Sequence, residues 1–392
     1  MRATFTSRWT QTLLVLTLIA LSTVSAFGDA AVATNSAPGS WPYSNGDLSN
    51  TRDAVGSTIS LANVSTLKKA WSFVLKGTST QNVGGYGTLA ANPIVVNGVV
   101  YMQDLHSNVY ALSLATGKLE WTYYVNKKEK SGPGPNGVAV VNGTVYGATP
   151  FAVFALNATT GHQLWSNDKL LNKGQGSFGI QPQVANGRVY VASQYGLVPG
   201  GGVLLALNAA TGKLIWKTPV GTHNGHDNDS TNALKGNSKI TVPYTYEPGA
   251  LGGILTNMAV AGSTVYVATC NFAFKFTNTD QVNGLNVGKK ISGNVEALNI
   301  VTGKVEWNTK VDSLPLGATT ISNNLVFTTL ISGKLLALNR TTGAIVLTQQ
   351  LPRATNSPIA IAGNTVIIPA GGPKYGKGSG PAQIIAYRVP ST

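Results

Sequence analysis

Five segments of the sequence repeat one pattern, and this repetition restricts the possible folds more than any other feature. Each segment is an apolar run, a turn containing Thr-Gly, and a second apolar run that closes on Trp or, in the last copy, on Leu. A further apolar run lies upstream of each segment behind a short turn, which in three copies is Asn-Gly, a strong hairpin signal. The unit is therefore expected to be a four-stranded antiparallel meander of about 40–45 residues. The five segments end at Trp121, Trp165, Trp216, Trp307 and Leu347.

A meander of this length cannot bury both of its faces by itself, so the copies must stack against one another around a common axis. The predicted fold class is all-β, a β-propeller built of four-stranded antiparallel blades. The four tryptophans share one position in the repeat. We expect them to dock each blade against its neighbour rather than to stack on a ligand.

The two ends of the chain are each expected to supply part of one blade. Residues 357–389 contain three apolar runs but no Trp-bearing fourth, and a run around Trp71 supplies a strand without a blade of its own. Pairing the two termini closes the ring and leaves no free sheet edge. Six repeats are recognisable, and because residues 217–252 carry no repeat signature, the blade count stays open between six and eight. The expected domains are an N-terminal extension over 27–65 and one propeller over 66–392 with an insert at 217–252.

Residues 1–26 have the pattern of a secretory signal peptide. Arg2 and Arg8 precede an apolar run, which is followed by small residues that end at Ala26 and are typical of a cleavage site. The apolar run is shorter than the roughly 20 residues that a membrane-spanning helix needs. No Cys stands near the cleavage site to carry a lipid. The mature protein is therefore expected to be secreted or periplasmic, without a membrane anchor.

Charge and cysteine usage exclude several classes of function. The chain has 28 Lys and Arg against 14 Asp and Glu, but the basic residues are dispersed, so no nucleic-acid partner is expected. Cys270 is the one cysteine, which excludes a disulfide framework and a multi-cysteine metal site. A folded protein loses stability in acid as its paired carboxylates become protonated, so a chain with few carboxylates loses less. The hypothesis that follows is an acidic habitat.

Three stretches are the most specific parts of the sequence, and the first and the last of them go beyond a generic blade pattern. They are "WPYSNGDLSNTRDA" from Trp41 with "LKKAW" after it, the repeated "ALNxxTGKxxW", and the stretch from Pro315 to Gly343. In these stretches the chain resembles the quinoprotein alcohol dehydrogenase-like propellers with PQQ-like repeats. The resemblance implies an oxidoreductase that acts on an alcohol or another small substrate and uses pyrroloquinoline quinone (PQQ) with calcium.

The resemblance also indicates where a cofactor would lie. In the enzymes a Glu before the first blade's Thr-Pro touches the quinone, and here that stretch holds Asn92. An Arg in an Asn-Arg-Gly motif opens their second blade, and here the matching stretch holds Asn136. Asn92 and Asn136 are therefore the cofactor-binding candidates. The family's glutamate ligand to calcium, its vicinal cysteine pair and the Trp that stacks on the quinone have no counterpart in this chain.

The segment "HNGHDNDS" follows the Trp216 strand roughly where the dehydrogenases carry their catalytic Asp. By that register Asp229 is the candidate general base, which takes the proton of the alcohol, and Asp227 is its neighbour. His223 and His226 in the same segment, together with these carboxylates, form a second possibility, a metal site. Asn271 aligns with a strand end where the enzymes place an Asn on calcium and is a third metal candidate.

Fold alone does not choose between functions, so two alternatives to the dehydrogenase stay open. One is a propeller without a cofactor that serves as a scaffold and holds a protein partner at one face, as in outer-membrane protein assembly. The other is a hydrolase of the tetrathionate hydrolase type, in which an acidic residue carries the chemistry. A small-molecule substrate or a protein partner at the propeller face is the corresponding expectation for partners.

Overall fold

The computed structural model describes residues 39–77, 83, 86–125, 137–172, 175–194, 202–220, 244–246, 253–276, 287–373 and 379–390. These residues fall within one compact unit, Thr34–Thr392. The predicted signal peptide and most of the 217–252 insert lie outside the described residues. Among the described residues the one helix is the short 3-10 turn η1 (Val64–Thr66). None of them forms a helix with the length and apolar character needed to span a membrane.

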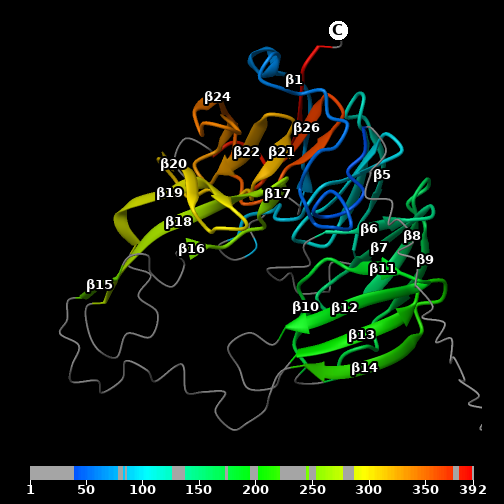
Figure 1. The fold of residues 1–392 in the computed structure, drawn as a ribbon. Helices are drawn as coiled ribbons and strands as arrows, with labels where there is room; N and C mark the ends of the chain where they lie inside the picture. The colour runs from blue at the N-terminus through cyan, green and yellow to red at the C-terminus, as the bar shows by residue number, and fades with distance from the viewer. Residues whose placement is uncertain are drawn as a thin grey trace, which may run out of the picture. The chain divides into compact units, whose positions relative to one another are not determined.

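Six antiparallel sheets make up the described structure, as the all-β propeller prediction requires (Figure 1). Each sheet is a meander that begins with a short inner strand. The first sheet has β2 (Ile94–Val96), β3 (Val99–Gln103), β4 (Val109–Ser113) and β5 (Leu119–Tyr123). The second has β6 (Ala139–Val141), β7 (Thr144–Ala148), β8 (Val153–Asn157) and β9 (Gln163–Asn167). The third has β11 (Gln183–Ala185), β12 (Arg188–Gln194), β13 (Gly202–Asn208) and β14 (Leu214–Val220), with β10 (Ser177–Phe178) on β12.

The remaining sheets follow the same order. The fourth has β17 (Ala259–Ala261), β18 (Thr264–Phe276), β19 (Val287–Asn299) and β20 (Val305–Val311), with β15 (Tyr244–Tyr246) and β16 (Gly253–Ile254) on β18. The fifth has β21 (Thr320–Ser322), β22 (Leu325–Leu330), β23 (Lys334–Asn339) and β24 (Ile345–Gln350). The sixth has β25 (Ala360–Ala362), β26 (Thr365–Ala370), β27 (Gln383–Arg388) and β1 (Lys68–Val74).

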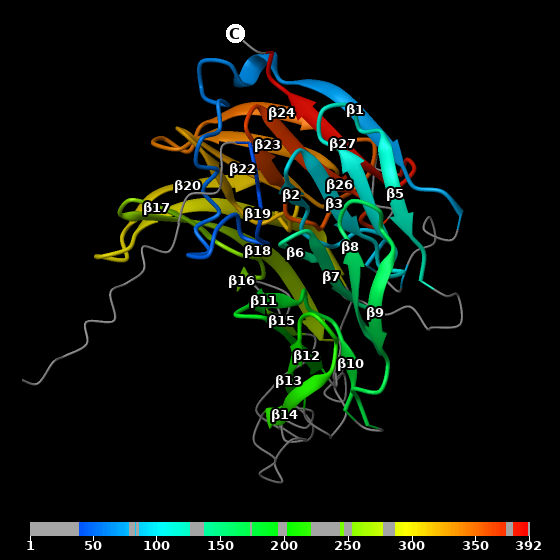
Figure 2. The same ribbon diagram turned by 90° about the vertical axis from the view of Figure 1, so that its right-hand side faces the viewer.

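The sixth sheet joins the two ends of the chain, as predicted. Strand β1 pairs antiparallel with β27, with Lys68 opposite Arg388 and Val74 opposite Gln383, and Figure 2 shows the two strands side by side. The three Asn-Gly turns also have the predicted geometry, because both residues of each turn have positive φ, as at Asn97 (51°) and Gly98 (76°).

The inner strands connect the sheets to one another. Contacts join β11 to β6, β6 to β2, β2 to β25, β25 to β21, and β21 to β17. The apolar clusters lie between neighbouring sheets, as in the group that joins Tyr101 of the first sheet to Phe154 of the second. The core is therefore divided among the joints between blades.

Three of the four repeat tryptophans, Trp121, Trp165 and Trp307, form these joints as expected, and Trp71 forms another. Each indole N–H donates to a carbonyl of the next sheet, and each ring lies where a Cβ on that sheet's turn glycine would be. The hydrogen bonds join Trp71 to Leu114, Trp121 to Ala158, Trp165 to Ala209 and Trp307 to Arg340, over 2.8–2.9 Å.

Trp216 departs from this rule although it has the same repeat position. Its ring packs on Tyr190 with centroids 6.1 Å apart, just as Trp165 packs on Tyr146. It is nevertheless 37% exposed, and nothing lies within 4 Å of a Cβ built on Gly303, the glycine in the matching turn. The joint between the third and fourth sheets is therefore not made through this pair.

Residues 41–58, which we call the axial strap, run along the inner strands. Trp41 bridges Val95 of the first sheet, the N–H of Val260 in the fourth donates to Thr51, and Ala54 donates to Ile321 of the fifth. Thr58 then donates to Gly363 of the sixth over 3.2 Å. The strap thus hydrogen-bonds to four sheets and ties the inner strands together.

Candidate functional site at the axial end

Two residues before each inner strand lies one position that recurs in all six sheets. At this position the first three sheets carry Asn92, Gly137 and Gln181. Because the inner strands of these sheets contact one another in order, the three residues lie at the same axial end. The other three sheets carry Asn257, Ala318 and Pro358 there.

Asn92, Gly137 and Gln181 form one cluster at this end. Gly137 has φ +121°, and a Cβ on it would lie 3.2 Å from Gln181 Oε1 and 3.5 Å from the backbone carbonyl oxygen of Asn92. Gln181 Nε2 donates to the Val138 carbonyl over 2.7 Å, which fixes the orientation of the amide. A side chain at residue 137 would therefore crowd the two neighbouring polar groups.

Both amides in the cluster present an unused acceptor. Asn92 Oδ1 and Gln181 Oε1 are buried and have no hydrogen-bond partner among the described residues. A buried acceptor without a partner is uncommon, because it costs about 1–3 kcal/mol of desolvation. Each of these oxygens is therefore suited to a ligand that brings an O–H or N–H donor.

The axial strap carries a fully buried basic side chain, Arg52. Burial lowers the pKa of its guanidinium to about 9. The group lies 5.4 Å from the centroid of the Trp41 ring. Its donors are occupied by the carbonyls of Ser44, Thr319 and Ile359 and by the side-chain oxygens of Asn45 and Thr320. Arg52 therefore holds the strap to the fifth and sixth sheets and is not available to an anionic ligand.

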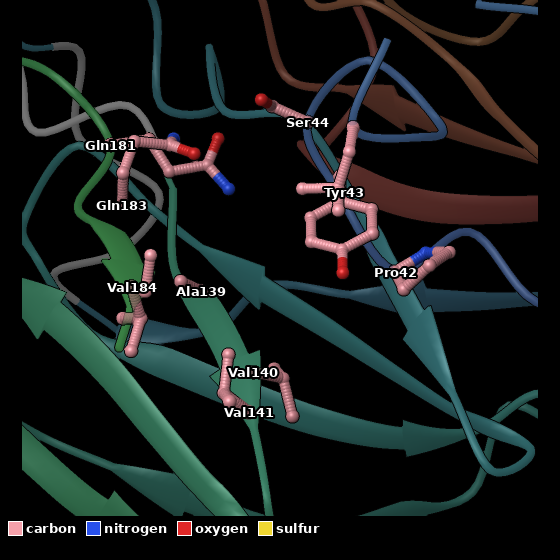
Figure 3. A pocket seen from close by; sticks show the side chains of 11 residues that line it. Pro42, Tyr43, Ser44, Ala139, Val140, Val141, Gln181, Gln183 and Val184 are labelled. Carbon is pink, nitrogen blue, oxygen red and sulfur yellow. The ribbon is translucent and has the colours of Figure 1, made fainter. Parts of the chain in front are cut away.

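A pocket of about 120 Å³ lies between the strap and the inner strands of the second and third sheets (Figure 3). Its wall carries Gln181 at one end. None of its lining residues within the described part of the chain is charged. The lining residues are Pro42, Tyr43, Ser44, Leu48, Ala139, Val140, Val141, Gln181, Gln183, Val184 and Ala185.

Of the predicted site residues, Asn92 lies in the axial cluster and Asn271 lies on β18. The Asn271 amide N–H donates to Asn294 Oδ1 over 2.8 Å, so its visible role is a link between β18 and β19. Next to it Cys270 is buried, which raises the pKa of its thiol to about 11. The assignments of Asp227, Asp229, His223, His226 and Asn136 fall outside the described residues and stay predictions. Among the described residues no group of three or more His, Cys, Asp or Glu side chains could hold a metal ion.

Sequence reasoning missed Gln181 and Arg52. A signal for Gln181 was present, because Gln181-Pro182 stands at the same place in its repeat as Asn92-Pro93. Arg52 had no such signal, since only the fold brings residues 319, 320 and 359 around it.

Two protein-family models match the chain. The β-propeller domain of glucose, ethanol and alcohol dehydrogenases matches residues 41–139. The model of the outer membrane protein assembly factor BamB matches residues 128–322 and 291–379.

Several curated proteins are similar in sequence. The dehydrogenase subunit of a quinone alcohol dehydrogenase from Komagataeibacter europaeus is 28% identical over 310 residues, 72% of this chain and 40% of its own. A quinohemoprotein alcohol dehydrogenase from Comamonas testosteroni is 32% identical over 189 residues, 45% of this chain and 25% of its own. A tetrathionate hydrolase from Acidithiobacillus ferrooxidans is 31% identical over 122 residues, 30% of this chain and 23% of its own. The chain thus spans less than half the length of these relatives.

The fold is also found among solved structures. A quinohemoprotein alcohol dehydrogenase from Pseudomonas putida HK5 superposes with a TM-score of 0.70 and 17% identity, over 92% of this chain and 82% of its own. At that identity the likeness shows the fold alone.

Proposed function

We propose that this chain, which belongs to the quinoprotein alcohol dehydrogenase-like family of β-propellers with PQQ-like repeats, is an exported oxidoreductase that binds a small alcohol at its axial end. The observation that carries the proposal is the pair of buried, unused acceptors, Asn92 Oδ1 and Gln181 Oε1. The names of the relatives, several of which are alcohol dehydrogenases, support the reaction class.

An alcohol suits these acceptors because its hydroxyl is a hydrogen-bond donor. A neutral hydrogen bond that satisfies a buried acceptor contributes about 0.5–1.5 kcal/mol. The hydroxyl has one proton, so it would donate to one of the two oxygens. Oxidation to a carbonyl removes the hydroxyl proton and a hydride from the neighbouring carbon. Asp229, with Asp227 beside it, is the residue that we assign to take the proton, and the hydride would pass to a bound redox cofactor.

The cofactor of the family imposes a stricter test on the site. PQQ is a trianion held with a hard dication, and calcium takes six to eight oxygen ligands. Asn92 and Gln181 could supply two neutral oxygens. Among the described residues no acidic cluster stands nearby, and the donors of Arg52 are already occupied. The described residues alone therefore do not fit PQQ with calcium, and we derive no step through it.

The experiment uses the purified full chain with PQQ and calcium, or a lanthanide, and a dye that accepts electrons from alcohol oxidation. Alcohol-dependent dye reduction is expected, together with loss of that activity in Asp229→Asn and its retention in the matched control Asp168→Asn, whose side chain is exposed. Asn92→Leu is expected to raise KM more than it lowers kcat. Absence of both a quinone absorbance change and dye reduction would contradict the proposal.

Two other functions have specific support. The tetrathionate hydrolase relative favours hydrolysis, which predicts tetrathionate cleavage without any quinone and its loss in Asp229→Asn. The match to the assembly-factor model, together with the exposed Leu214, Ile215 and Trp216, favours a protein scaffold at the third sheet. A scaffold predicts no turnover of either substrate.

A further inference from the structure

The pocket beside the axial strap has the properties of a binding site that none of the predictions above assigned. The strap supplies one wall through Pro42, Tyr43 and Leu48, and β6 and β11 supply the other. Figure 3 shows Tyr43 and Ser44 across the pocket from the Gln181 side chain. The pocket therefore lies between two parts of the chain more than 90 residues apart in sequence.

The size of the pocket limits what it can hold. Its volume is about 120 Å³. An apolar cavity of roughly 150 Å³ is known to hold one benzene molecule. A single ring or a short aliphatic chain is therefore the expected upper limit for the buried part of a ligand.

The chemistry of the wall limits the charge of the ligand. Val140, Val141 and Val184 provide apolar contact, and the described residues that line the pocket include no Lys, Arg, Asp or Glu. A charged ligand would lose its hydration without gaining an ion pair, which is costly. The ligand is therefore neutral.

One polar atom would orient a ligand in the pocket. Gln181 Oε1 is buried and has no hydrogen-bond partner in the described part of the chain. The hydrogen bond from Nε2 to the Val138 carbonyl prevents the amide from turning to present its N–H groups instead. Only a donor satisfies this oxygen. The ligand consequently carries an O–H or N–H group at the end that lies by Gln181.

From these properties we propose that the strap pocket binds a neutral, single-ring or short-chain compound that donates one hydrogen bond to Gln181, with phenol-sized hydroxy compounds as the ligand class. Because Gln181 belongs to both sites, we also assign the pocket to the apolar part of the alcohol substrate. That assignment rests on the proposed function. Binding itself does not depend on turnover.

The test is fluorine NMR titration of the purified full chain with three probes, without PQQ. Saturable binding of 4-fluorophenol is expected, with fluorobenzene about tenfold weaker because it lacks the donor. No binding of 4-fluorobenzoate is expected. Equal affinity for 4-fluorophenol and fluorobenzene would overturn the role of Gln181.

Variants locate the binding within the molecule. Ala185→Phe fills the pocket from an exposed strand end and is expected to abolish binding, whereas Ala261→Phe, at the same strand position in the fourth sheet, leaves it unchanged. Gln181→Met is expected to keep fluorobenzene binding and to remove the preference for 4-fluorophenol. If Ala185→Phe binds 4-fluorophenol as the unmodified chain does, the pocket is not the site.

The outcomes separate this inference from the proposed function. Probe binding without alcohol oxidation upholds the strap pocket and contradicts the dehydrogenase. If the unmodified chain oxidises alcohol but binds no probe, and Ala185→Phe oxidises alcohol equally well, the dehydrogenase is upheld and the strap pocket is contradicted.

Discussion

The indole N–H of Trp121 donates to the backbone carbonyl of Ala158 over 2.8 Å, and its ring fills the space above Gly161 in the next sheet. The same relationship recurs wherever two neighbouring sheets are joined by a repeat Trp. The residue at one position of the repeat thus makes the contact that sets the distance between neighbouring blades. Two predictions about stability follow from this contact.

The turn glycines provide the first prediction. A Cβ on Gly161 would lie 2.6 Å from the Trp121 ring, and φ there is +70°. Gly303 has φ +68° with open space around it. Gly303→Ala should therefore cost only the left-handed backbone penalty, about 1–2 kcal/mol. Gly161→Ala should lose about 1–3 kcal/mol more through the clash. Urea unfolding measures both, and equal losses would show that the Trp121 contact does not matter.

The tryptophans provide the second prediction. Trp165→Phe removes a hydrogen bond of 2.9 Å to Ala209 and part of a packed ring, so a loss of about 1–3 kcal/mol in unfolding free energy is expected. Trp216→Phe should change it by about 0.5 kcal/mol or less, because this indole docks on no turn glycine. Thermal unfolding of the two variants gives the comparison. A large loss in Trp216→Phe would mean that the third and fourth sheets dock through Trp216 in solution.

The third prediction concerns Arg52. Replacing it by Met leaves the carbonyls of Thr319 and Ile359 without their donor and removes the link between strap and sheets, so a loss of about 3–5 kcal/mol is expected. Arg52→Lys should recover only part of this, since one ammonium cannot reproduce the fork of the guanidinium. The exposed Arg188→Met is the matched control and should be near neutral in chemical denaturation. A mild effect of Arg52→Met would argue that the strap contributes little to the fold.

The fourth prediction concerns acid. Burial raises the pKa of the Asp53 carboxyl above its usual value, with Arg340 opposing the shift and Asp47 adding to it. The folded state then holds a proton more tightly than the unfolded state, so stability from this group falls as pH rises from about 3.8 through the raised pKa. The free energy of unfolding of Asp53→Asn, compared with that of the unmodified chain, should therefore be higher at pH 7 than at about pH 4. Urea midpoints at the two pH values test this, and the opposite order would contradict the assigned shift.

Much of the fold follows from the sequence alone. The Asn97-Gly98 turn and its copies require positive φ, and alternating apolar runs lie on either side of them. A meander is the local structure that satisfies both the turns and the alternation. The pairing of β1 with β27 was also predictable, because one end of the chain lacked a strand that the other end supplied. These features depend on local backbone geometry and on repetition, both of which are written into the order of residues.

The axial site depends on contacts that no local pattern records. Asn92 could be selected from its place in the repeat, but its unused oxygen and that of Gln181 appear only when three inner strands come together at Gly137. Arg52 becomes a buried cation only because the strap passes between strands more than 260 residues further along the chain. Local sequence thus determined the blade, because turns and alternation act within a few residues. The tertiary structure decided which polar atoms are left without water or a partner, because burial is a property of the packed sheets together.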